Sequence, residues 1–411
     1  MSRRFTLTTV LVLLLLGAVA PLDSKVPKTV APFLPKEIFQ EHFLTRPALM
    51  DHFEDLKSEF ESPNIAVSGD AKYLVIGTCQ PKWMDNDDYE FYFYLLVYDV
   101  TQKAYAQVLC VGQEFLQVDD SFADVQVSPD DRLVAVTWSN AISVYDFDNT
   151  KGKLEHKWTK RIYLGETVAC DQYAWCTFSE DGKRLLVTCP PHPRIEFDTL
   201  SGRRLLASRH SKVVPGGVTQ PFYTSGAVRS SPRQIALLLD NWCDQKRQES
   251  VQGIVVYDFD SKQAKFLKLE EPSCYTRPRL AFQPGKNLLV AAYVAPHPKI
   301  IGRALQLLRW EWETNSVQKD LLGTYWMCCS DLLFSPDGAY LLVLLVPNWI
   351  GDPGLLVIDT TEWKVLKGYR LPSSRGYRGV FAQQAKQLVL LSCDAHLLLV
   401  DWPKFVDNVR K

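Results

Sequence analysis

The chain of 411 residues is 46% hydrophobic and 12% aromatic, so it can bury a large core. Its 46 basic and 47 acidic residues give a formal net charge of −1. Such a balance supplies no overall field that would attract nucleic acid or an anionic membrane surface. Length alone indicates about two or three domains, but an internal repeat favours a single repetitive fold.

The first twenty residues differ from the rest of the chain. Arg3 and Arg4 precede an apolar run at 7–16, and the small residues of 17–20 follow. A positive start, a short apolar core and small residues are typical of a secretory signal. The run is shorter than the about 20 apolar residues that span a membrane. We therefore expect residues 1–20 to be a signal peptide; an uncleaved N-terminal anchor and a segment with neither role remain as alternatives.

Residues 21–60 form a second segment. Four prolines fall within 21–35, a composition typical of an extended tether. In the following part, 36–60, apolar residues such as Ile38, Phe39 and Phe43 recur at roughly helical spacing, which predicts one or two short helices broken near Pro47. The alternative is that part of this lead-in is a strand.

From residue 61 to 411 one unit recurs. Its clearest copy has an apolar run at Leu332–Phe334, the turn Ser335–Gly338 and a second apolar run at Tyr340–Val346. Pro presets a turn's φ and Gly accepts a positive φ, so these runs are typical of strands joined by tight turns. Seven copies of the first run and its turn residue occur, at 65–68, 125–128, 176–179, 228–231, 280–283, 332–335 and 380–383.

Each repeat contains up to four such runs. The third usually ends on an acid after an apolar residue, as in Tyr98-Asp99, Phe197-Asp198 and Ile358-Asp359, and a more polar fourth run follows. Four strands in seven repeats predict an all-β fold, a seven-bladed β-propeller of four-stranded antiparallel blades. A pair of β-sandwiches is the alternative, but sandwich strands do not repeat as blocks of four.

The turn at Ser335–Gly338 and the aromatic-Asp pairs resemble those of WD-repeat and related β-propellers, and the resemblance covers Ile65 to Trp402. The Gly-His pair of that family is missing. Its Trp-Asp pair is replaced by Tyr-Asp, Phe-Asp, Ile-Asp or Val-Asp, which favours a divergent bacterial-type propeller. The resemblance implies a scaffold, and a scaffold alone does not imply a chemistry.

The last repeat has only three recognisable strands. The tail at 403–411 is polar and begins with a proline, so it is a poor fourth strand. The lead-in at 36–60 lies just before the first repeat and would sit beside the last one in a closed ring. We therefore predict that it closes the ring and covers the open sheet edge.

Ten cysteines are scattered over different repeats. They show no Cys-x-x-Cys or Cys/His spacing, so we predict no metal site and favour buried, inert thiols. One or two disulfides are the alternative for an exported chain. The glycines form no phosphate-binding pattern, and we expect no cofactor.

Three further motifs have plain structural explanations. The acidic insertion at 80–90 lacks the glycine and final glutamate of an EF-hand, so we expect a solvated loop rather than a Ca²⁺ site. Two Pro-His-Pro segments, at 191–194 and 296–299, are interpreted as stiff turns. Five tryptophans near strand ends should fill the space between blades, with a stacking platform as the alternative for the last two: Trp138, Trp175, Trp242, Trp326 and Trp349.

The loops that lead into the first strand of each repeat carry acids, arginines and a tyrosine that could converge at the mouth of a central channel. The candidate binding residues are Asp120, Asp124, Asp171, Tyr173, Arg277, Arg279, Asp331 and Arg378. No nucleophile elbow or other catalytic constellation is present, and we assign no catalytic residue.

The sequence therefore favours a non-enzymatic, exported β-propeller (periplasmic, surface-located or secreted) that presents loops for binding a protein or another ligand. An enzyme with a polar or carbohydrate substrate at the channel mouth is the alternative, and a structural envelope component is a third hypothesis. We expect a monomer that binds an unidentified protein, binds no nucleic acid, and meets a membrane only through its N-terminal segment.

Overall fold

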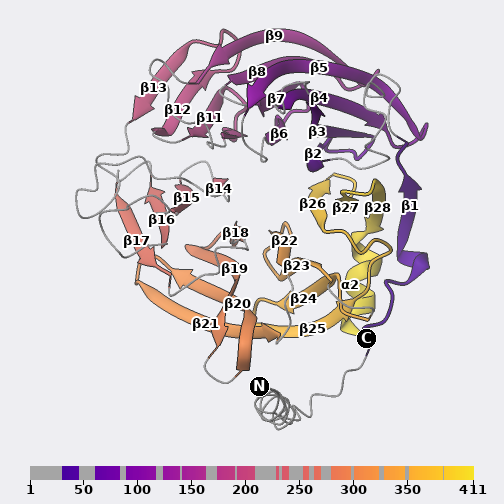
Figure 1. Ribbon diagram of the computed structural model, residues 1–411, viewed down its shortest axis with the longest axis vertical. Helices are drawn as coiled ribbons and strands as arrows, with labels where there is room; N and C mark the ends of the chain where they lie inside the picture. The colour runs from indigo at the N-terminus through magenta and orange to yellow at the C-terminus, as the bar shows by residue number, and fades with distance from the viewer. Residues whose placement is uncertain are drawn as a thin grey trace, which may run out of the picture.

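The computed structural model describes residues 30–45, 61–83, 89–116, 124–138, 141–162, 174–189, 192–208, 228–230, 234–239, 253–258, 263–269, 279–297, 300–323, 328–347, 351–382 and 384–411. These residues form seven four-stranded antiparallel sheets arranged as blades around a central axis (Figure 1). The predicted seven-bladed propeller is confirmed.

The first four blades follow one another along the chain. Blade 1 comprises β2 (Glu61–Val67), β3 (Tyr73–Trp83), β4 (Tyr89–Asp99) and β5 (Ala104–Leu116). Blade 2 comprises β6 (Asp124–Val127), β7 (Leu133–Trp138), β8 (Ala141–Asp148) and β9 (Lys153–Arg161). Blade 3 comprises β10 (Trp175–Phe178), β11 (Arg184–Cys189), β12 (His192–Asp198) and β13 (Arg204–Ser208). Blade 4 comprises β14 (Val228–Ser230), β15 (Gln234–Leu239), β16 (Gly253–Asp258) and β17 (Ala264–Lys268).

The last three blades complete the ring. Blade 5 comprises β18 (Arg279–Phe282), β19 (Leu288–His297), β20 (Ile300–Glu311) and β21 (Ser316–Gly323). Blade 6 comprises β22 (Cys328–Phe334), β23 (Tyr340–Val346), β24 (Leu355–Asp359) and β25 (Lys364–Tyr369). Blade 7 comprises β26 (Tyr377–Ala382), β27 (Gln387–Ser392), β28 (His396–Asp401) and, from the other end of the chain, β1 (Phe39–Phe43). The first strand of each repeat is the innermost, as Figure 1 shows for β2, β6, β22 and β26.

The turn between the first two strands is held by its own side chains. In blade 6 the Ser335 hydroxyl accepts a hydrogen bond from Tyr340 N at 2.9 Å and donates to the Asp337 carboxylate, which accepts from Ala339 N at 3.1 Å. Gly338 occupies a positive φ of 69°, where a side chain would be strained. The same serine-to-backbone bond recurs at Ser68, Ser128 and Ser179. The predicted turn chemistry is confirmed.

Blade 7 is closed by the N-terminal segment, as predicted. β1 pairs antiparallel with β28, from Phe39 opposite Val400 to Phe43 opposite His396. The helical interpretation of the spacing at Ile38, Phe39 and Phe43 was wrong beyond the short 3-10 helix η1 (Lys36–Ile38). The open edge of β28 offers a ladder of hydrogen bonds, and this distant partner outweighs the local pattern.

The two segments that flank β1 and β28 also pack on the ring. Leu34, in the part expected to be a tether, is buried, and its N–H donates to Arg370 O at 3.0 Å. The tail forms the helix α2 (Trp402–Arg410), not a strand, because Asp401 caps it by accepting from Lys404 N and proline occupies its first turn. Phe405 of α2 lies in the same apolar cluster as Leu34 and Ile38.

The core consists of apolar layers between neighbouring blades. Trp138 lies in the layer between blades 1 and 2, with its ring centroid 5.8 Å from that of Phe93 and its indole N–H donating to Ser143 Oγ at 3.1 Å. A Cβ at Gly112 would come within 2.3 Å of this indole, so the glycine is required by the close approach. The predicted inter-blade role is confirmed for Trp138, whereas Trp242, Trp326 and Trp349 lie outside the described residues.

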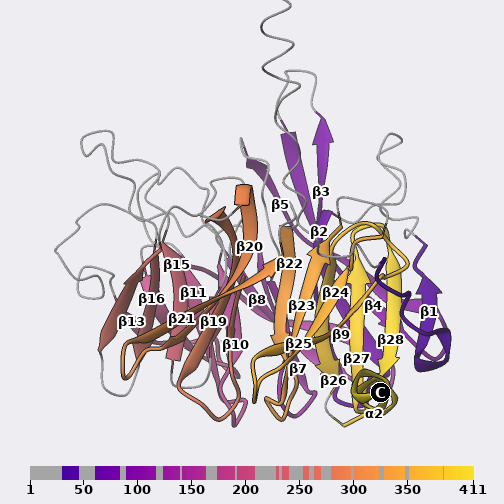
Figure 2. The same cartoon turned by 90° about the horizontal axis from the view of Figure 1, so that it is seen from below.

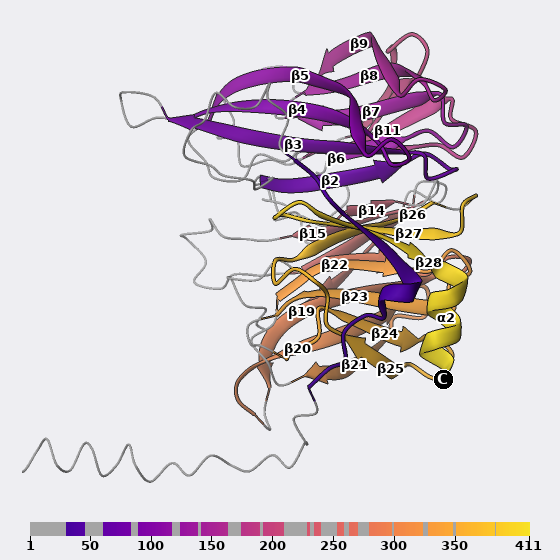
Figure 3. The same ribbon diagram turned by 90° about the vertical axis from the view of Figure 1, so that its right-hand side faces the viewer.

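Blade 1 is longer than its neighbour. The insertion expected to be a loop at 80–90 is mostly strand, because β3 continues to Trp83 and β4 begins at Tyr89; residues 84–88 lie outside the described part. Pro81 is tolerated because it lies beyond Cys79, the last β3 residue paired with β2. The extended strands project from one side of the ring, opposite the side where α2 lies (Figures 2 and 3).

Residues 1–29 are outside the described part of the chain, so the export signal stays a prediction. Within the described ranges, no helix is long and apolar enough to cross a membrane.

Candidate functional site at the channel mouth

The structure describes four of the eight predicted site residues; Asp120, Asp171, Tyr173 and Arg277 are not among them. The four others lie on inner strands: Asp124 on β6, Arg279 on β18, Asp331 on β22 and Arg378 on β26. Asp124, Arg279 and Arg378 lie at the start of their strands, and Asp331 lies midway along β22, next to Arg378 of β26. This start is the end of each strand away from the Ser-x-Asp turns. We call this side of the ring the mouth face and the other the turn face.

Asp331 ties blade 6 to blade 7. One carboxylate oxygen accepts from Leu332 N at 2.9 Å, and the other accepts from Gly379 N of β26 at 3.0 Å. In return the Arg378 guanidinium of β26 donates to Ser330 O at 3.0 Å. The residue is buried, so these two bonds satisfy a charge that would otherwise be expensive to bury.

Arg279 connects blade 5 to the same cluster, because its Nε donates to Cys329 O at 3.4 Å. The Cys329 thiol lies among the three charged groups and donates to Asp331 O at 3.1 Å. Burial raises the pKa of this thiol to about 12, Asp331 adds to the shift, and Arg279 and Arg378 oppose it. This direction favours the protonated thiol, which is a poor nucleophile.

Asp124 lies apart from this cluster, since β6 and β22 are on opposite sides of the channel (Figure 1). Its Oδ2 accepts from Cys176 N of β10 at 2.9 Å, which ties blade 2 to blade 3. Burial raises the pKa of the Cys176 thiol, and Asp124 adds to that shift. The structure thus brings together Arg279, Asp331 and Arg378 and leaves Asp124 outside.

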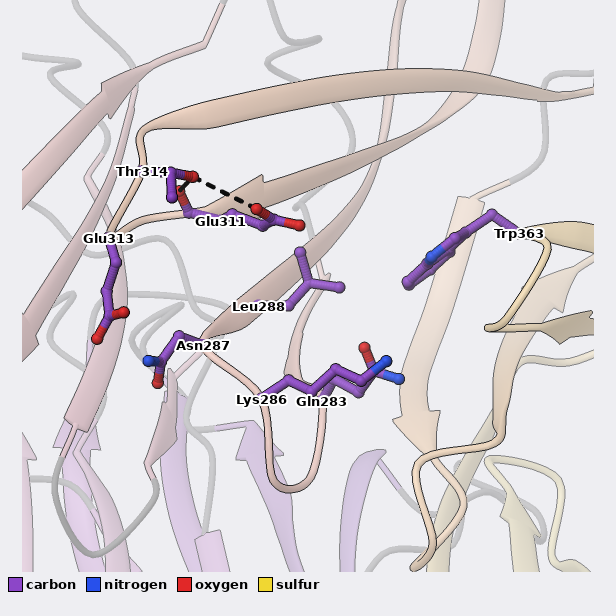
Figure 4. A pocket seen from close by; sticks show the side chains of 8 residues that line it. All are labelled: Gln283, Lys286, Asn287, Leu288, Glu311, Glu313, Thr314 and Trp363. Atoms are coloured by element: carbon purple, nitrogen blue, oxygen red, sulfur yellow. Dashed lines mark hydrogen bonds between the residues drawn. The ribbon is translucent and has the colours of Figure 1, made fainter.

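A second feature, on the turn face, was missed by sequence reasoning. A hollow of about 260 Å³ lies between blades 5 and 6 (Figure 4). Its lining side chains are Gln283, Lys286, Asn287, Leu288, Glu311, Glu313, Thr314 and Trp363. The sequence gives only a weak signal for it: Gln283 stands where Ser68, Ser128, Ser179 and Ser335 stand in other repeats, but repeat 7 also has glutamine there, at Gln383.

The structure describes the side chains of six of the ten cysteines. The structure gives six free thiols: Cys79, Cys110, Cys176, Cys328, Cys329 and Cys393. Of these six residues only Cys110 is exposed. Partial removal of its thiol from water is still the main cause that raises its pKa. The described residues contain no group of three or more His, Cys, Asp or Glu that could hold a metal ion.

No family model matches the chain, and no curated protein sequence is significantly similar to it. Among solved structures 783 chains match. One is the crystal structure of Saccharomyces cerevisiae Sqt1, a WD40 β-propeller, which has a TM-score of 0.51 and 11% sequence identity over 88% of this chain and 97% of that chain. This likeness concerns the fold. The chain therefore has the fold of a WD-repeat-like β-propeller, and this fold alone does not define a function.

Proposed function

We propose that this protein is a non-enzymatic β-propeller scaffold that binds another protein through its mouth face, outside the cytoplasm. The observation that carries the proposal is that the charged groups at the channel mouth are engaged in holding the blades together. Asp331, Arg378, Arg279 and Asp124 all form hydrogen bonds to the backbone of an adjacent blade. Such groups hold the ring in shape, whereas a catalytic acid or base must exchange protons with a substrate.

The mouth face also carries the extended strands of blade 1, which project beyond the ring (Figure 3). A rigid ring with a projecting hairpin provides a fixed platform on which loops can vary, and binding residues are commonly found on loops of this kind. This asymmetry supports the mouth face as the main contact surface.

Export is supported by the sequence at 1–20, with its Arg3-Arg4 start and its apolar run. The divergent strand-three pairs support a bacterial-type propeller. Fractionation of the source cells, with N-terminal sequencing of the mature chain, tests export. Recovery in the cytoplasm with residue Met1 intact would contradict it.

The scaffold proposal is tested by cross-linking the full chain in the exported fraction and mapping the cross-linked peptides. We expect one partner, retained through a salt wash, with its main set of cross-links on the mouth face, and a monomer in its absence. Turnover of a polysaccharide or another polar substrate that Arg378→Lys abolishes at an unchanged melting temperature would favour the enzyme alternative. Absence of any saturable binding would favour the structural-component hypothesis.

A further inference from the structure

The hollow on the turn face has an unusual wall. Gln283 directly follows β18, the inner strand of blade 5, and its side chain reaches across to blade 6, where Nε2 donates to Gly338 O at 2.8 Å and to Thr360 Oγ1 at 3.2 Å. The Thr360 hydroxyl donates its own proton to Gly338 O at 2.6 Å. A carbonyl oxygen can only accept, so the orientation of the Gln283 amide is fixed by its partners.

The other end of this amide is left without a partner. Gln283 is only 3% exposed, and its Oε1 has no hydrogen-bond donor in the described part of the chain. Buried acceptors are rarely unpaired, so this oxygen marks a place where a donor is required. Figure 4 shows the Gln283 amide extending from its turn toward Trp363, on the side of Leu288.

The charges around the hollow define which donor fits. Glu311 extends over Leu288, and one of its carboxylate oxygens accepts from Thr314 Oγ1 at 3.3 Å, which holds the group in place (Figure 4). Glu313 adds a second carboxylate, and Lys286 is the single cation in the lining. The lining is therefore rich in acceptors and carries an excess of negative charge.

Trp363 closes the hollow on the side of blade 6. One arginine already lies against its ring: the Arg309 guanidinium carbon is 4.6 Å from the ring centroid. This contact shows that the indole is electronically suited to a guanidinium, since the ring's negative face attracts cations.

We propose that this hollow binds an arginine side chain of a protein partner. A guanidinium has five N–H donors in one plane, so it can pair with the Glu311 carboxylate beside the Trp363 ring and still donate to Gln283 Oε1 once the side chains that cover this buried oxygen move aside. A lysine ammonium has three donors around a point charge and fits the same chemistry less well. The inference rests on the proposed scaffold function for the source of the arginine, and it adds a second contact on the face opposite the channel mouth.

The test uses the full chain and small probes. Binding of N-acetyl-arginine amide is measured by ligand-detected NMR and compared with the lysine, citrulline and glutamate analogues. Citrulline keeps the shape of arginine but lacks its charge. We expect arginine to bind best, lysine more weakly, and citrulline and glutamate to show no saturable binding.

Two variants that should change the affinity for arginine in opposite directions make the test specific. Glu311→Gln removes a carboxylate and should weaken arginine binding about threefold, the order expected for a partly exposed charge pair. Lys286→Met removes the competing cation and should strengthen binding by a similar factor. Glu155→Gln, an exposed acid on β9 of blade 2, is the control and should change nothing.

Equal binding of citrulline and arginine, or unchanged affinity in both lining variants, would overturn the proposal. All three positions are at the surface, and melting temperatures equal to that of the unmodified chain confirm that folding is intact. If the probes fail while cross-links to a partner still map to the mouth face, the scaffold function stands and only the arginine site falls. If the probes bind but no partner is found, the arginine site stands and the scaffold function falls.

Discussion

At the scale of single residues, the serine and aspartate of each Ser-x-Asp turn have different tasks. Ser335 is fully buried and supplies the acceptor for Tyr340 N, whereas Asp337 is exposed and accepts from Ala339 N. Loss of the buried acceptor leaves a backbone N–H without a partner and without water, which is the more damaging outcome.

The two substitutions should therefore differ. Asp337→Ala should lower the free energy of unfolding by about 1 kcal/mol, and Ser335→Ala by roughly 1–3 kcal/mol. Chemical denaturation of the full chain measures both, with Glu362→Ala, in the turn between β24 and β25 of the same blade, as the control. Equal losses would mean that burial does not separate the two roles.

The charged residues of the channel mouth have a structural role that mutation can isolate. In Asp331→Asn the side chain must present an NH₂ group either to Leu332 N or to Gly379 N, because both carboxylate oxygens are acceptors in the native chain. One of the two hydrogen bonds is then lost, because the asparagine NH₂ group and the backbone N–H that it faces are both donors. We expect destabilisation of roughly 1–3 kcal/mol, with partner binding retained at temperatures well below unfolding.

At the scale of secondary-structure elements, β1 is the strand that joins the two ends of the chain. It covers the edge of β28, and the residues before it bury Leu34 and Ile38 against the cluster that contains Phe405. An uncovered β28 would present a row of unpaired backbone groups, which is a template for association with another chain.

Two truncations test this role of β1. Removal of residues 1–29 leaves every described contact in place and should leave the melting temperature unchanged. Removal of residues 1–45 also deletes β1 and the buried Leu34, so the melting temperature should fall and oligomers should form in size-exclusion chromatography. Equal melting temperatures for the two truncated chains would disprove closure by β1.

The same strand should respond to pH. His42 of β1 is buried beside the Tyr98 hydroxyl, at 3.4 Å from Nδ1, and burial and then the positive charge of Lys103 lower its pKa below the usual 6.5. The unfolded chain then binds more protons than the folded chain as the pH falls, so this contribution to stability is present above about pH 6.5 and is lost below it.

The measurement is the melting temperature between pH 8 and pH 5 for the native chain and for His42→Phe. The native chain should lose more stability on acidification. The contact of His396 Nδ1 with Glu41 Oε1 across the same strand pair, at 3.0 Å, is present in both chains and cancels in the comparison. An identical pH dependence in the two chains would contradict the assignment to His42.

Local signals predicted the blades well and the long-range features less well. The turn at Ser335–Gly338 is encoded in four adjacent residues, so its position and chemistry followed from the sequence. The pairing of β1 with β28 joins Phe39 to Val400, and the spacing around Phe39 also suits a helix. The register placed Asp331 at the channel mouth, but its partner Gly379 N is 48 residues away and no local pattern indicates that bond.

At the scale of the whole molecule, side chains tie some neighbouring blades on the mouth face and others on the turn face, with apolar layers between the blades. On the mouth face Asp331 bridges blades 6 and 7; on the turn face Asp131 of blade 2 accepts from Gly69 N of blade 1 at 2.9 and 3.0 Å. Each tie is made by a side chain to a backbone group, so it restrains the position of the next blade without depending on that blade's own side chains. The ring therefore keeps its shape while the sequences of its loops can vary.

Closure by β1 also determines how the ring would respond to a mechanical load. Phe39 and Val400 face each other where β1 begins and β28 ends, so a pull on the two chain ends acts at the same end of that strand pair. The pull would first detach Leu34 and Ile38 from α2 and blade 6, and would then open the β1–β28 ladder one hydrogen bond at a time, because the load is perpendicular to the strands rather than along them. A tethered copy of this protein would therefore yield at blade 7 while the six other blades carry little of the force.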